Sequence, residues 1–107
     1  MIELLIASAI HAAMFQSAAA VSARQELVTC LRKAVEDAKT QKLSADGFAD
    51  FAKQQCATQQ SRLKAAIWAF DSKNKISRSQ SEADAEAQIE DYVATQAGRY
   101  ESAMAQQ

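Results

Sequence analysis

Residues 27–70 read LVTCLRKAVEDAKTQKLSADGFADFAKQQCATQQSRLKAAIWAF, in which two largely apolar stripes flank a short polar turn. The first stripe consists of Leu27, Cys30, Leu31, Ala34, Val35 and Ala38. The second consists of Phe48, Phe51, Ala52, Cys56, Gln59, Leu63, Ile67 and Phe70. Positions three and four residues apart lie on one face of an α-helix. The segment is therefore predicted to form two antiparallel helices, a helical hairpin.

The turn of the hairpin is marked by residues that favour helix starts. If Ser44 is the N-cap of the second helix, Leu43 and Phe48 occupy the two positions of a hydrophobic staple. Asp46 then lies in the first turn, where the helix dipole favours a negative charge. These features together predict that the second helix begins at Ala45.

The two cysteines, Cys30 and Cys56, lie on the two stripes at similar distances from the turn. Each is about 13 residues, or roughly 20 Å of helix, from the turn, so antiparallel helices bring them level. A disulfide that closes this loop is expected to contribute about 3 kcal/mol to the free energy of unfolding. The alternative is a pair of buried free thiols in a cytosolic protein. A redox-active or catalytic pair is disfavoured because no C-x-x-C motif is present.

The composition extends the helical prediction to the whole chain, because 24 residues are Ala, two are Gly and none is Pro. A third helix is predicted to start at a capping box, Ser79-x-x-Glu82, with Ser77-x-x-Gln80 as the competing start. Its apolar stripe comprises Ala85, Ile89, Tyr92, Val93, Tyr100 and Met104, with Gln96 on the same face. The predicted fold is all-α: an up-down-up three-helix bundle with helices near residues 22–42, 45–70 and 80–103, in one domain that covers residues 24–107.

The N-terminal residues 1–23 have the outline of a secretory signal peptide. Apolar residues are densest in residues 1–15, and two small-x-small cleavage sites follow, Ala18-Ala19-Ala20 and Val21-Ser22-Ala23. Two features depart from the pattern: Glu3 stands where a basic residue is usual, and His11 interrupts the apolar run. We expect cleavage and a periplasmic or secreted protein without stable membrane insertion. The alternative is a retained apolar helix on a cytoplasmic protein.

Charge is nearly balanced over the chain, with 12 basic and 13 acidic residues, so nucleic acid is not predicted as a partner. The distribution is uneven: residues 24–78 hold 11 basic and 6 acidic residues, and residues 79–107 hold 1 basic and 6 acidic residues. An acidic third helix is therefore expected to dock on a basic hairpin. The candidate anion-binding face is Arg32, Lys33, Lys39 and Lys42.

The sequence lacks the residues that most catalytic chemistries require. His11 is the only histidine and lies in the signal-like segment, so histidine catalysis and histidine metal ligands are not expected. The row Glu82, Glu86 and Glu90 is interpreted as a solvated acidic face, not a calcium site. No enzyme activity, metal or cofactor is predicted.

The leading functional hypothesis is a small exported helical protein that acts by binding another protein, with self-association left open. The rival hypothesis is a small-ligand carrier with an apolar pocket between the helices. Both use the same aromatic residues, as partner contacts or as a pocket lining: Phe48, Phe51, Trp68 and Tyr92.

Overall fold

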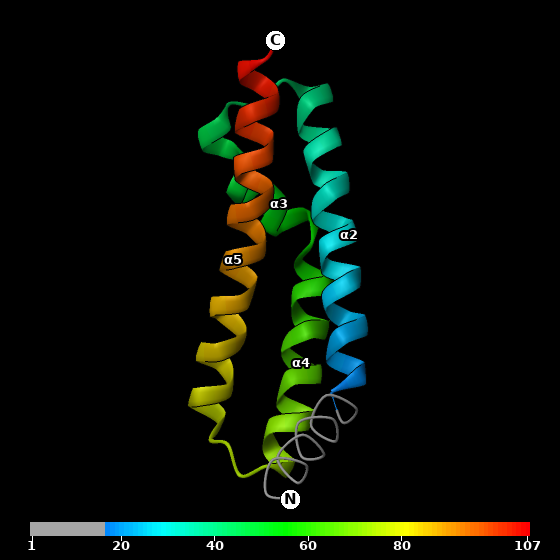
Figure 1. The fold of residues 1–107 in the computed structure, drawn as a ribbon, viewed down its shortest axis with the longest axis vertical. Coiled ribbons are helices and arrows are strands. Elements are labelled where there is room, and N and C mark those ends of the chain that lie inside the picture. The colour runs from blue at the N-terminus through cyan, green and yellow to red at the C-terminus, as the bar shows by residue number, and fades with distance from the viewer. Residues whose placement is uncertain (1–16) are drawn as a thin grey trace, which may run out of the picture.

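The computed structural model describes residues 17–107 as an all-α bundle (Figure 1). Its elements are α2 (Ala18–Gln41), the 3-10 turn η1 (Ala45–Gly47), α3 (Phe48–Gln55), α4 (Ala57–Lys73) and α5 (Arg78–Ala105). In the view of Figure 1, α2 rises, α3 and α4 descend, and α5 returns to the C-terminus. The predicted up-down-up bundle is confirmed. Its first arm is α2, its second arm runs from η1 through α4, and its third arm is α5. Residues 1–16, which include His11 and most of the signal-like segment, lie outside the described residues.

The second arm differs from the prediction because it is two helices instead of one. The break lies at Cys56, whose φ of −106° and ψ of 25° leave the α-helical region and separate α3 from α4. No Pro or Gly stands near this position, so the sequence pattern carries no signal for the break. The side chain of Gln60 donates a hydrogen bond of 2.8 Å to the Lys53 carbonyl, which the break deprives of a helical partner.

In Figure 1, α3 runs obliquely behind α5. Its first residue, Phe48, belongs to the buried core. Phe48 is fully buried and stacks on Tyr100, with 5.0 Å between the ring centroids. The Tyr100 hydroxyl donates hydrogen bonds to the carbonyls of Leu43, at 2.5 Å, and Ala38, at 3.3 Å. One aromatic pair therefore ties α5 to α3 and to the turn after α2.

The core follows the predicted stripes on all three arms. The buried apolar residues are Ala20, Ala23, Leu27, Leu31, Ala34, Val35, Ala38, Phe48, Ala52, Cys56, Leu63, Ile67, Ala85, Ile89, Val93 and Tyr100. Cys30 and Phe51 are only half-buried. Among residues 17–107, no helix is long and apolar enough to cross a membrane.

The helix starts differ from the predictions by a few residues, since α2 begins at Ala18 and not near residue 22. Ser44 is extended and begins η1 without a side-chain hydrogen bond, so the α-helix starts only at Phe48. For α5, the competing site is the one used: Ser77 is the N-cap, and its hydroxyl accepts a hydrogen bond of 3.2 Å from the Gln80 N–H.

Lys42 ends α2 in the left-handed conformation, with a φ of 55°. The Lys42 and Leu43 N–H groups each donate 3.1 Å hydrogen bonds, to Lys39 and Ala38 respectively, which is the Schellman pattern. Because this position favours glycine, we expect Lys42→Gly to raise the free energy of unfolding by about 0.5 to 1 kcal/mol in urea denaturation. The matched control is Arg32→Gly, in the exposed interior of α2, which should lower it by about 1 kcal/mol. Destabilisation by both variants would contradict the left-handed cap.

The Tyr100 hydroxyl provides a second test of the turn. Tyr100→Phe keeps the stacked ring but leaves the Leu43 carbonyl without this donor, so we expect a loss of about 1 to 3 kcal/mol. Thermal and urea unfolding measure this. Tyr92→Phe is the control, because the half-buried Tyr92 hydroxyl has no hydrogen bond among the described residues, and its effect should be near zero. Equal effects of the two variants would show that the hydroxyl does not hold the turn.

Candidate functional site

The candidate functional site is a groove between α4 and α5, hereafter the Trp68 groove. It encloses about 570 Å³ and is lined by Ser61, Lys64, Ala65, Trp68, Ala69, Arg78, Ser81, Glu82, Ala85 and Glu86. Five of its ten lining residues are Ala or Ser: Ser81 and Ala85 are buried on α5, and Ser61, Ala65 and Ala69 lie four residues apart at exposed positions of α4. Side chains at this spacing share one helix face, so the groove runs along the helices for about two turns.

Trp68 is the one aromatic side chain among these lining residues, and it is half-buried. The Arg78 guanidinium carbon lies 4.8 Å from the centroid of the Trp68 ring, which is cation–π geometry. Arg78 Nε also donates a 3.2 Å hydrogen bond to Glu82. The two residues come from opposite sides of the turn between α4 and α5, so the fold of this turn positions the indole.

The glutamate row of α5 is exposed to solvent, and its members form ion pairs, of which Glu82 pairs with Arg78 of the same helix at 3.2 Å. Glu86 pairs with Lys64 of α4, and Glu90 pairs with Lys53 of α3 at 2.6 Å. This partnership with Glu90 holds the pKa of Lys53 above its usual value of 10.5. The contacts confirm the predicted docking of an acidic helix on a basic hairpin, although exposed pairs of this kind each contribute little stability.

The other three predicted aromatic residues do not line the Trp68 groove. Phe48 is fully buried against Tyr100, where a ligand has no access to it. Phe51 and Tyr92 are half-buried and pack against the core. The structure therefore does not bring Phe48, Phe51, Trp68 and Tyr92 together as one pocket lining, because α3 crosses the bundle instead of continuing α4.

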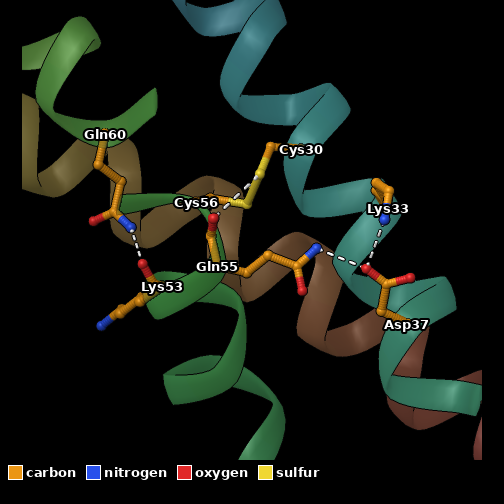
Figure 2. The surroundings of a disulfide bond; sticks show 7 residues. All are labelled: Cys30, Lys33, Asp37, Lys53, Gln55, Cys56 and Gln60. Atoms are coloured by element: carbon orange, nitrogen blue, oxygen red, sulfur yellow. Dashed lines mark hydrogen bonds and ion pairs between the residues drawn. A yellow bond between two sulfur atoms is a disulfide. The ribbon is translucent and has the colours of Figure 1, made fainter. Parts of the chain in front are cut away.

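The disulfide joins Cys30 in the middle of α2 to Cys56 at the α3–α4 break, with 5.9 Å between the Cα atoms (Figure 2). The predicted cross-link between the first two arms is confirmed. Cys30 Sγ lies 3.9 Å from the Gln55 carbonyl, a contact without a hydrogen bond because a disulfide sulfur carries no hydrogen.

Asp37 connects α2 to α3 next to the disulfide (Figure 2). It accepts hydrogen bonds from Lys33, at 3.0 Å, and from the Gln55 amide, at 2.8 Å. These donors, Lys33 first, hold the pKa of Asp37 below 3.8. Because the folded-state pKa is lowered, the contribution of this carboxylate to stability is present above about pH 4 and is lost as the pH falls through the folded-state value.

The candidate anion-binding face is partly neutralised by its own helix. Lys33 pairs with Asp37, and Lys39 pairs with Glu36 at 3.3 Å. Arg32 and Lys42 are exposed. Two of the four cations thus face carboxylates that compete with any incoming anion.

Sequence reasoning did not identify Arg78 or the groove. The available signal was an arginine in the first turn of a helix, ten residues after a tryptophan in the last turns of the preceding helix. Among residues 17–107, no group of three or more His, Cys, Asp or Glu side chains is placed to hold a metal ion. The chain matches no protein-family model, no curated protein and no solved structure.

Proposed function

We propose that the protein is an exported, non-catalytic binding protein whose Trp68 groove receives a helix of a partner protein. The observation that carries this proposal is the half-exposed Trp68 held against Arg78 in a groove whose lining is half Ala and Ser. Tryptophan and arginine are the side chains most enriched at the energetic centres of protein interfaces.

The shape of the groove favours a helix over a compact small molecule. It lies between two antiparallel helices, and the Ala and Ser residues of its lining allow another backbone to approach closely. The rim carries two cations and two carboxylates, namely Lys64, Arg78, Glu82 and Glu86. A partner helix with an apolar stripe between polar flanks of both charges matches this rim, and the rim pairs would set its register.

Export is supported by the disulfide, because disulfides persist in oxidising compartments. Both cleavage sites of the signal-like segment lie within the first turns of α2, where Ala20 and Ala23 are buried. Cleavage after Ala20 keeps Ala23 in the bundle along with the 2.8 Å hydrogen bond from Arg24 to Gln88. Cleavage after Ala23 removes both buried methyl groups and leaves Arg24 as the first residue. Core burial thus favours the site after Ala20.

Site-specific photo-crosslinking in the native host tests the binding site. A photoreactive residue at Ala65, within the groove, is expected to give one discrete protein adduct, while the same residue at Ala87, exposed on α5 outside the groove, is not. In the protein that carries the photoreactive residue at position 65, Trp68→Ala should lower the affinity for the partner about 30-fold or more. A hot-spot tryptophan contributes about 2 kcal/mol or more to binding.

Circular dichroism of the Trp68→Ala variant controls for loss of fold. A folded variant that retains the full adduct would contradict the proposal, as would an equal adduct at Ala87. A shift of Trp68 fluorescence by a small metabolite, without any protein adduct, would favour the carrier instead.

A further inference from the structure

The two cysteines of the disulfide differ in their exposure to solvent. Cys30 is half-buried and lines a surface groove between α2 and α4, whereas Cys56 is 0% exposed. This groove, hereafter the Cys30 groove, is lined by Ser22, Gln25, Glu26, Thr29, Cys30, Lys33, Gln59 and Arg62. Apart from Cys30, every lining residue is polar or charged. A reagent in water therefore approaches the disulfide from the Cys30 side.

Cys56 stands between two helix ends, the C-terminus of the 8-residue α3 and the N-terminus of the 17-residue α4. These two dipole ends have opposite signs, so they largely cancel at a thiolate on Cys56. Cys30 lies in the middle of the 24-residue α2, away from both ends of that helix. The direction of attack is therefore decided by access to the two cysteines.

We propose that Cys30 is a thiol-exchange site, the sulfur through which the disulfide is opened and re-formed by a thiol-bearing reagent in the Cys30 groove. An attacking thiolate forms a bond to Cys30 Sγ, the Sγ–Sγ bond breaks, and its electron pair leaves on Cys56 Sγ, which then takes a proton from water. A second thiol, from the same dithiol or from another monothiol molecule, then attacks the reagent sulfur that is bonded to Cys30. Cys30 leaves as a thiolate. The reagent thus becomes a disulfide and supplies the two electrons. Oxidation by a disulfide reagent runs the same steps in reverse.

Two kinds of reagent can supply the attacking thiol, namely a small monothiol such as glutathione and a protein dithiol. Both require the same mixed disulfide on Cys30, and neither can form it on the buried Cys56. This inference does not depend on a partner in the Trp68 groove, because the Cys30 groove lies between a different pair of helices and shares no lining residue with it.

Brief reaction of the oxidised full chain with glutathione, quenched with acid and alkylation, tests the proposal. Trypsin separates the two sites into residues 25–32, which hold Cys30, and residues 54–62, which hold Cys56. We expect glutathione on Cys30 in at least about tenfold excess over Cys56, because access decides which sulfur is attacked. Equal labelling, or labelling mainly on Cys56, would overturn the proposal. In denaturant the preference should disappear, which identifies the fold as its cause.

A protein dithiol whose second cysteine is replaced by serine distinguishes the second source. It should be trapped as a covalent complex on Cys30, and a complex on Cys56 would contradict the proposal. A bulky residue in the groove, Thr29→Trp, is expected to slow exchange several-fold, whereas Thr40→Trp, exposed near the far end of α2, should not. Equal rates for these two folded variants would show that the groove is not the route of attack.

Discussion

Replacement of Phe48 by alanine is expected to lower the free energy of unfolding by about 3 to 5 kcal/mol, a large part of the stability of a domain of this size. Phe48 is fully buried at the point where α3 meets α5, and its ring stacks on Tyr100 at 5.0 Å. Removal of the ring leaves a cavity beside Tyr100 and takes away the aromatic contact between α3 and α5.

Urea denaturation of the oxidised protein measures this loss. Phe51→Ala is the matched control, because Phe51 is half-buried on the same short helix, and it should cost about half as much. A Phe48→Ala effect below about 1 kcal/mol, or one equal to that of Phe51→Ala, would contradict the placement of Phe48 in the core.

The same substitution separates folding from binding. The sequence made Phe48 and Trp68 equivalent as candidate contact residues, but the structure places only Trp68 in a surface groove. We therefore expect Phe48→Ala to weaken partner binding in proportion to the unfolded fraction, and Trp68→Ala to weaken it with the fold intact. Differential scanning calorimetry beside the crosslinking assay distinguishes the two effects.

Loss of the disulfide is the second large effect. Cys30→Ser removes a cross-link between two residues that are 26 positions apart in the sequence. It should lower the free energy of unfolding by about 3 to 4 kcal/mol, because the unfolded chain gains entropy. Because Cys30 is half-buried, the serine hydroxyl remains near solvent and adds little to this cost.

The wild-type protein, fully reduced, is the control for this substitution. Its free energy of unfolding should fall by the same amount as that of Cys30→Ser, because both lack the same loop constraint. If reduction of the wild type changed its stability by less than about 1 kcal/mol, the disulfide would not be the staple of the hairpin. A Cys30→Ser effect much larger than that of reduction would show that Cys30 makes a packing contribution of its own.

The helices and the disulfide could be predicted because each depends on local periodicity. Leu27, Leu31 and Ala38 repeat at helical spacing. Cys30 and Cys56 are equally far from the turn, so the helical rise alone places them side by side in the hairpin. The docking of α5 on the hairpin followed from the uneven distribution of charge. None of these inferences requires knowledge of how side chains pack between helices.

The break at Cys56 could not be predicted, because residues 53–60 contain no helix-breaking residue and only tertiary contacts favour it. The oblique course of α3 then separates Phe48 from Trp68, which the sequence had grouped together. The sequence also could not decide between Ser77 and Ser79 as the N-cap of α5, because each is followed three residues later by Gln or Glu. The pairing of Arg78 with Trp68 depends on the turn between α4 and α5, which has no sequence signature of its own.

The proposed role depends first on the chain being exported and oxidised, and the intact mass of the protein purified from its native host tests this most directly. We predict a chain that begins at Val21, with Arg24 as the alternative start, and that weighs about 2 Da less than its reduced form, because a disulfide removes two hydrogens. A chain that retains Met1 and carries two free thiols would contradict both the export and the disulfide.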